Sequence, residues 1–199
     1  IEPSAGSGKT NTIAWLAHIL ASLHDDANRN IFSNIIIVTD RIIVDRQLQD
    51  AVTQIEHKSG QLKVMDDDCK SEDLANALRG NTKIIVTTIH KFFYILENNL
   101  LGRLKDKTFA VLIDEAHSST EGTLMQAVTT VLSGSNEDDD EEDRTIEDKI
   151  SEEIQKSGKQ PNVSMIAFTA TPKPSTIQLF GVLNENGKKG AFDLYSMRQ

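Results

Sequence analysis

Four short runs of apolar residues, rich in isoleucine and valine, recur along the 199-residue chain and constrain its fold more than any other feature. Runs of this length and composition are typical of strands buried on both faces of a parallel sheet. The four runs are Asn34–Asp40, Lys83–Thr88, Phe109–Glu115 and Ser164–Ala170, and weaker candidates lie at Gln61–Met65 and Ala191–Ser196.

Segments with the apolar spacing of helices separate these runs. They predict helices over residues 13–23, 44–55, 71–78 (with Ser71 as its cap), 118–131 and 146–154. Alternating strands and helices predict an α/β fold, a three-layer parallel sheet with helices on both faces. We expect a single domain over residues 1–199.

The net charge of −9 argues at first against a nucleic-acid partner, but the charge is uneven. Seven acidic residues fall within the eight residues Asn136–Asp143, and without them 23 acids face 21 bases, a formal charge of −2. A local basic face can therefore still bind phosphate backbones. We expect residues 133–148 to form a flexible acidic insertion away from any DNA, with partner binding as the alternative.

Other classes of protein find little support in the composition. No apolar run approaches the roughly 20 residues of a membrane helix, and no signal peptide is visible. The single cysteine, Cys69, cannot form an internal disulfide or a zinc cluster, which fits a reducing, cytoplasmic setting. We expect Cys69 to be an incidental thiol.

The stretch SAGSGKT, Ser4–Thr10, has the second half of a phosphate-binding loop. Gly6 and Gly8 allow backbone N–H groups to curl around phosphate oxygens ahead of a helix. Lys9 is then expected to reach the β- and γ-phosphates, and Thr10 to bind Mg²⁺. Proline stands at position 3 where the pattern has glycine, which removes one donor but spares the later ones. The alternative is a flexible turn.

An acid pair follows the third strong run. The apolar residues Ala110–Ile113 lead directly into Asp114 and Glu115, so both acids lie at the ligand-binding end of the predicted sheet. Asp114 is expected to hold Mg²⁺, and Glu115 to orient and deprotonate the attacking water. The alternative is a pair of acids favoured by the dipole at a helix start.

Three motifs, GSGKT, DEAH and TAT, occur here in that order, at residues 6–10, 114–117 and 169–171. The set resembles the first, RecA-like motor domain of superfamily 2 helicases and translocases. Longer runs, such as IIVTDRIIVDRQLQ, VLIDEAHSS and FTATPKPSTIQLFG, resemble the restriction (R) subunit of type I restriction–modification enzymes. The resemblance implies an ATP hydrolase that couples hydrolysis to movement on duplex DNA as part of a type I deoxyribonuclease.

The resemblance also implies residue roles. The nucleotide would bind at Ala5, Gly6, Ser7, Gly8, Lys9 and Thr10, with Lys9, Asp114 and Glu115 as catalytic residues and Thr10 and Asp114 as Mg²⁺ ligands. Coupling of hydrolysis to movement would fall to His117, Thr169, Ala170 and Thr171. DNA contacts would come from Thr39, Asp40, Arg41, Thr87, Thr88, His90 and Lys91. Asp40 and Thr88 also fit plain helix caps, and Thr169 and Thr171 also fit a strand end.

The implied partners are duplex DNA, a second motor domain and a nuclease domain in the same parent chain, and methyltransferase and specificity subunits. The first strand should precede Pro3 and is truncated, so we expect a fragment of a larger polypeptide. Because the resemblance implies that the second motor domain supplies an arginine finger and closes the ATP site, we expect this fragment to hydrolyse ATP weakly or not at all by itself. Two alternatives stay open. One is a stand-alone DEAH-type helicase acting on DNA or RNA, and the other is a non-catalytic nucleotide-binding interaction module.

Overall fold

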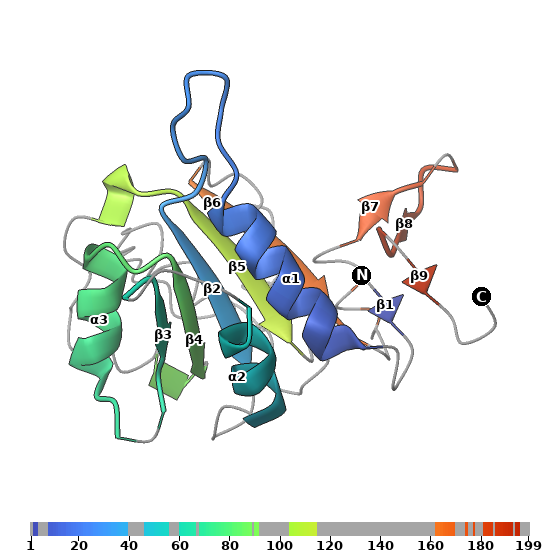
Figure 1. Cartoon of the computed structure of the whole chain (residues 1–199). Coiled ribbons are helices and arrows are strands. Elements are labelled where there is room, and N and C mark those ends of the chain that lie inside the picture. Colours follow the sequence, from blue (N-terminus) through green and yellow to red (C-terminus); the bar gives the residue numbers. More distant parts are fainter. Residues whose placement is uncertain are drawn as a thin grey trace, which may run out of the picture.

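A parallel sheet of five strands lies at the centre of the computed structural model (Figure 1). The structure describes residues 2–3, 8–39, 46–55, 60–66, 68–88, 90–91, 104–114, 162–169, 174, 177, 181–184, 186–192 and 194–195. In order across the sheet, the strands are β3 (Leu62–Val64), β4 (Ile84–Thr88), β2 (Asn34–Thr39), β5 (Phe109–Asp114) and β6 (Val163–Phe168). The four strong strand predictions and the weaker one at Gln61–Met65 are confirmed.

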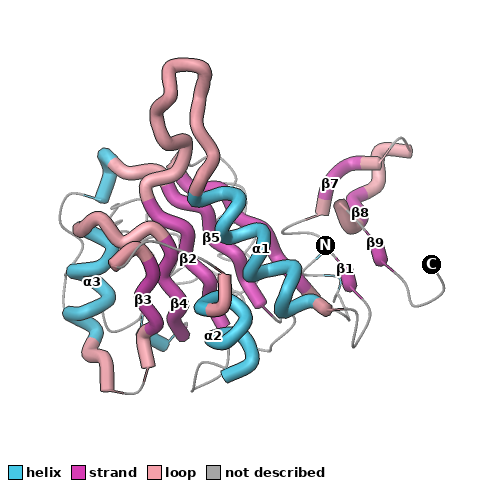
Figure 2. Tube along the Cα trace, viewed as in Figure 1, coloured by secondary structure: helices cyan, strands magenta, loops and turns pink. Residues whose placement is uncertain are grey.

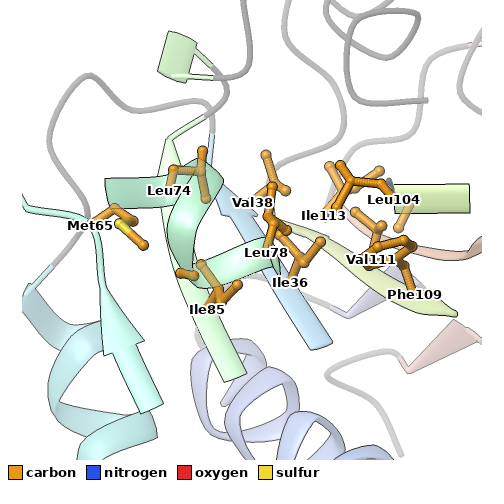
Figure 3. Packing of buried hydrophobic residues seen from close by; sticks show 12 residues of the cluster. Ile36, Val38, Met65, Leu74, Leu78, Ile85, Leu104, Phe109, Val111 and Ile113 are labelled. Carbon is orange, nitrogen blue, oxygen red and sulfur yellow. The ribbon is translucent and has the colours of Figure 1, made fainter. Parts of the chain in front are cut away.

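Helices cover both faces of this sheet. Helices α1 (Lys9–Ala21) and α2 (Arg46–Thr53) pack on one face, where Ile35 and Ile37 of β2 point. Helix α3 (Ser71–Arg79) packs on the other face, against Ile36 and Val38. Figure 3 shows Leu74 and Leu78 of α3 beside these strand residues. The predicted α/β fold, a three-layer parallel sheet with helices on both faces, is therefore confirmed.

Helix α3 has a different cap from the one expected, and it ends at Arg79, one residue after the predicted end. The carboxylate of Asp73 accepts a 2.8 Å hydrogen bond from the backbone N–H of Lys70, so Lys70 is the capping position and Ser71 is the first helical residue. The predicted cap at Ser71 was wrong by one residue because an acid within the first turn takes over the capping bond. At the other end, the Lys107 ammonium donates to the carbonyls of Leu78 and Gly80, at 2.7 and 2.6 Å.

The connection between α1 and β2 is a hairpin-like loop that rises beyond the end of the sheet (Figure 2). Asp25 and Arg29 form an ion pair of 2.8 Å within it, and His24 bridges to Asn30. The Thr108 hydroxyl donates to the carbonyl of Ile31 at 2.7 Å, which anchors the loop beside the start of β5. This loop lies at the end of the sheet opposite the predicted site.

Four very short strands lie outside the five-stranded sheet. Strand β1 (Glu2–Pro3) pairs in parallel with β9 (Leu194–Tyr195), and β7 (Val182–Leu183) pairs antiparallel with β8 (Lys189–Gly190). The weak prediction at Ala191–Ser196 is confirmed at Leu194–Tyr195, which form β9. The strand ahead of the phosphate loop is β1, whose two residues pair with β9.

Several expectations concern other parts of the chain. The predicted helices over 118–131 and 146–154 and the acidic insertion lie outside the described residues. Among the helices that the structure describes, none is long and apolar enough to cross a membrane.

Candidate ATP site

The predicted motifs meet because four strands end at the same level of the sheet. In the parallel register, Thr39 of β2 lies between Thr88 of β4 and Asp114 of β5. Asp114 lies in turn beside Phe168 of β6, and Thr169 follows directly. Since the carboxyl ends of parallel strands share one edge, segments up to about 130 residues apart in the sequence converge there.

The phosphate-loop helix begins at this edge. Gly8 adopts φ 84° and ψ 24°, a left-handed conformation, and Lys9 is the first residue of α1. The backbone N–H of Thr12 donates to Gly8 O at 3.0 Å, which is the first bond of the helix. The first turn of α1 holds no acidic residue, so its N–H groups and dipole favour an anion. Ala5, Gly6 and Ser7 lie outside the described residues.

Lys9 and Asp114, which come from α1 and β5, form the clearest contact of the site. The Lys9 ammonium lies 2.9 Å from Asp114 Oδ1, and the two side chains are only 16% and 17% exposed. This contact is ionic without hydrogen-bond geometry, since the buried Oδ1 accepts no hydrogen bond from any part of the chain that the structure describes. The pair brings together the two residues that the sequence assigned to phosphate and metal.

The same oxygen provides a test of fit for Mg²⁺. A buried carboxylate oxygen without a hydrogen bond keeps lone pairs for a hard cation, and Mg²⁺ prefers oxygen ligands. Thr10, half-buried in the first turn of α1, supplies a hydroxyl of the right chemistry. Among the described residues, no group of three or more His, Cys, Asp or Glu side chains is arranged to hold a metal ion. One carboxylate and one hydroxyl still suit Mg²⁺, which retains several waters.

The predicted DNA-contact residues divide into buried and accessible ones. Thr39, Thr87 and Thr88 are 2%, 0% and 2% exposed, and the Thr87 hydroxyl donates to Thr88 O at 3.4 Å. His90 is exposed just after β4, whereas Asp40 and Arg41 lie outside the described residues. The DNA-contact role of all these residues stays a prediction.

Lys91 makes contacts that the sequence did not suggest. Its ammonium donates to the backbone carbonyls of Asp66 and Cys69, at 2.6 and 2.9 Å. It thereby fastens the loop between β3 and α3 to the segment after β4. No local pattern marks this role, because the acceptors are main-chain atoms more than 20 residues away.

A hollow of about 500 Å³ lies beside this contact, lined by Cys69, Lys70, Ser71, Glu72 and Lys91. Burial raises the pKa of the Cys69 thiol, which therefore stays protonated at neutral pH. Hydrogen bonding from Cys69 lowers the pKa of Asp66, whose Oδ1 accepts from the Cys69 backbone N–H at 3.2 Å. A protonated, partly buried thiol agrees with the expectation of an incidental cysteine.

The coupling residues are placed only in part. Thr169 is 4% exposed directly after β6, at the end of the strand next to Asp114. His117, Ala170 and Thr171 lie outside the described residues, as does the expected base Glu115. Their roles stay predictions.

Comparison with known proteins adds one match. The model of a family described as SWI2/SNF2 ATPase matches residues 3–137, which include the phosphate loop, the first four strands of the parallel sheet and the acid pair. Among curated proteins, none matches the chain.

Proposed function

The chain belongs to the SWI2/SNF2 ATPase family, and from that premise we propose that it is the ATP-binding lobe of a DNA translocase. The proposal rests above all on the contact between Lys9 and Asp114, at 2.9 Å, at the edge where four strands end. A cationic group and an acid so placed suit phosphoryl transfer, which needs positioning and charge neutralisation more than covalent chemistry.

Within this site the roles follow from residue chemistry. The N–H groups after Gly8 and the Lys9 ammonium would bind the phosphates of ATP. Asp114 and Thr10 would hold Mg²⁺, which neutralises negative charge on the phosphates when bound. Lys9 would have to leave Asp114 in order to contact a phosphate. We assign activation of water to Glu115.

Duplex DNA is the track we propose. The chain outside Asn136–Asp143 is close to neutral. Basic side chains at the strand ends can therefore bind DNA phosphates without strong repulsion from the rest of the domain. The exposed His90 and the residues Asp40 and Arg41, which follow the buried Thr39, are the contacts we assign. Because such contacts go to the backbone, binding is expected to be independent of base sequence.

We place this motor in the restriction subunit of a type I restriction–modification enzyme, with a second motor domain and a nuclease domain in the parent chain. The support is the ordered motifs and the longer runs that resemble that subunit. Recognition of a DNA site would belong to the specificity subunit, and modification to the methyltransferase subunit. A stand-alone DEAH-type helicase is the other candidate, favoured only by the DEAH motif itself.

The ATP site is tested by replacing Lys9 in the full-length protein. A hydrogen bond to a charged group contributes about 1.5–3 kcal/mol, so Lys9→Ala should weaken ATP binding about 10- to 100-fold. Lys188→Ala, which removes an exposed lysine near β8, should leave the affinity unchanged. Titration of Mg²⁺-ATP by calorimetry measures both. Equal affinities in the two variants would contradict the assignment.

The nature of the track is tested by the ATPase rate of the wild-type full-length protein. We expect duplex DNA of arbitrary sequence to stimulate hydrolysis, and single-stranded DNA and RNA to have little effect. Stimulation by RNA or by single strands, together with strand separation, would favour the stand-alone helicase. Nucleotide binding without any hydrolysis would favour the non-catalytic module.

A further inference from the structure

A side-chain hydrogen bond joins the two helices that lie on the same face of the sheet. Nε2 of His18, in α1, lies 3.0 Å from the backbone oxygen of Val52, in α2. A carbonyl oxygen only accepts, so Nε2 carries the donated proton. The helices are also packed together, because Ala14 and Ala17 of α1 share a buried cluster with Val52.

The acceptor is a carbonyl that α2 cannot satisfy by itself. Helix α2 ends at Thr53, so the oxygen of Val52 is among the last four carbonyls, which have no partner within the helix. A donor at this end is also favoured by the helix dipole. The His18 bond therefore ties the last turn of α1 to the end of α2.

One of these two helices begins at the proposed ATP site, and the other follows the segment assigned to DNA contact. Helix α1 starts at Lys9, in the phosphate loop. Helix α2 follows the segment that begins after Thr39 and that we assign to DNA contact. The parallel ladder fixes Thr39 beside Asp114, whereas packed helices can slide by small shear motions. Relative motion of the two parts is therefore expected to pass through the helices.

We propose that His18 is a positioning residue that couples nucleotide binding to DNA binding by making α2 follow α1. This inference rests on the proposed function. A shift of α1 on binding phosphates would be passed to α2 through the bond, and DNA binding would act in the reverse direction. Linkage requires that each ligand change the affinity of the other by the same factor.

The test measures that factor in the full-length protein. The Kd of a fluorescent DNA duplex is determined by anisotropy with and without a Mg²⁺-bound, non-hydrolysable ATP analogue. His18→Phe keeps a planar ring but removes the donor, and we expect it to reduce the ratio of the two Kd values about threefold or more. The analogue's affinity in the absence of DNA should change by less than about twofold, which a general loss of structure would not allow.

Two variants serve as controls. His18→Gln retains an N–H donor and should keep the wild-type ratio. His24→Phe replaces an exposed histidine of the α1–β2 loop, whose Nδ1 contacts Ser22 O at 2.7 Å, and should also keep it. If His18→Phe does not unfold cooperatively, His18→Leu takes its place.

The outcomes distinguish a failure of the proposed function from a failure of the proposal about His18. If the wild-type protein binds no duplex DNA, the proposed function fails, and this inference fails with it. If it binds DNA but the ratio is the same in wild type and folded His18→Phe, or the wild-type ratio is one, only the inference about His18 is overturned. A loss of coupling in His18→Gln as large as in His18→Phe would also overturn it.

Discussion

Gly8 carries a backbone conformation on which the phosphate loop depends. Its φ of 84° lies in the left-handed region, which costs other residues roughly 1–2 kcal/mol. A Cβ atom at this position would meet no atom within 4 Å, so the requirement for glycine is conformational and not steric. The pattern of glycine before lysine thus records how the chain must turn into α1.

Replacing Gly8 by alanine should destabilise the full-length protein by roughly 1–2 kcal/mol and weaken ATP binding. Gly187 offers a matched control, because its φ is 73° and a Cβ there also meets nothing within 4 Å. Gly187→Ala should cause a similar loss of stability without loss of ATP affinity. Chemical denaturation measures the stability and calorimetry measures the ATP affinity. Equal ATP affinities in both variants would contradict the assignment of Gly8 to the phosphate-binding loop.

Single residues also mark the limit of pattern reading. The resemblance implied a DNA contact for Lys91, and that role stays a prediction. The sequence did not suggest that the Lys91 ammonium donates to the carbonyls of Asp66 and Cys69. A lysine side chain is long enough to reach either solvent or a neighbouring loop, and nothing in the flanking residues decides between them.

Among the elements, strand β2 lies at the centre of the sheet and packs against the helices on both faces. All six of its residues are buried, and alternate side chains pack under α1 and α2 on one face and under α3 on the other. A continuous apolar run is what a strand covered on both faces requires. The strand predictions succeeded for this reason, and Thr39 and Asp114 are the polar residues in which two of the buried strands end.

The end of helix α3 is held by Lys107, so replacing this lysine tests how much its contacts stabilise the helix. Burial lowers the pKa of Lys107, and the nearby Lys83 adds to this, so the buried charge itself is unfavourable. Two charged hydrogen bonds to helix carbonyls, each about 1.5–3 kcal/mol, outweigh that cost. Lys107→Met should therefore lower the free energy of unfolding by about 1–2 kcal/mol after allowance for partial exposure.

The neighbouring Lys83 serves as the control for this change. Lys83→Met removes a like charge near Lys107 and should leave stability equal or slightly higher. Urea denaturation monitored by circular dichroism compares the two variants. A Lys107→Met protein as stable as the wild type would mean that the buried charge cancels the capping bonds.

For the whole molecule, the uneven charge is the property that bears on DNA. Replacing the seven acids of Asn136–Asp143 by serine or asparagine would change the net charge from −9 to −2. If that segment lies farther from DNA than the Debye length, about 8 Å at physiological salt, the Kd for duplex should change less than about twofold. The slope of log K against log salt should also stay the same.

A negative charge introduced at the proposed DNA edge should act differently. His90→Glu places an acid at an exposed position just after β4, so it should weaken duplex binding clearly at low salt and less at high salt. Anisotropy titrations over a series of salt concentrations compare the two variants. A several-fold gain in affinity on neutralising the acidic segment would contradict its expected place away from DNA.

The sequence by itself determined the strands, the glycines that allow the chain to curl ahead of Lys9 and the chemistry of the motifs, because these depend on residues that are close along the chain. An apolar run that ends in an acid or a threonine predicts both a buried strand and a polar strand end. The choice of Lys9, Thr10 and Asp114 as candidate ligands needed no knowledge of contacts.

Only the tertiary structure decided which strand ends are neighbours. The order β3-β4-β2-β5-β6 sets Thr39 between Thr88 and Asp114, and it brings Lys9 within 2.9 Å of an acid more than 100 residues away. Each parallel pairing is made across a crossover, so its partner is chosen by packing between distant segments. The contacts of Lys91 and His18 arise in the same way, since their acceptors are main-chain carbonyls that no side-chain pattern encodes.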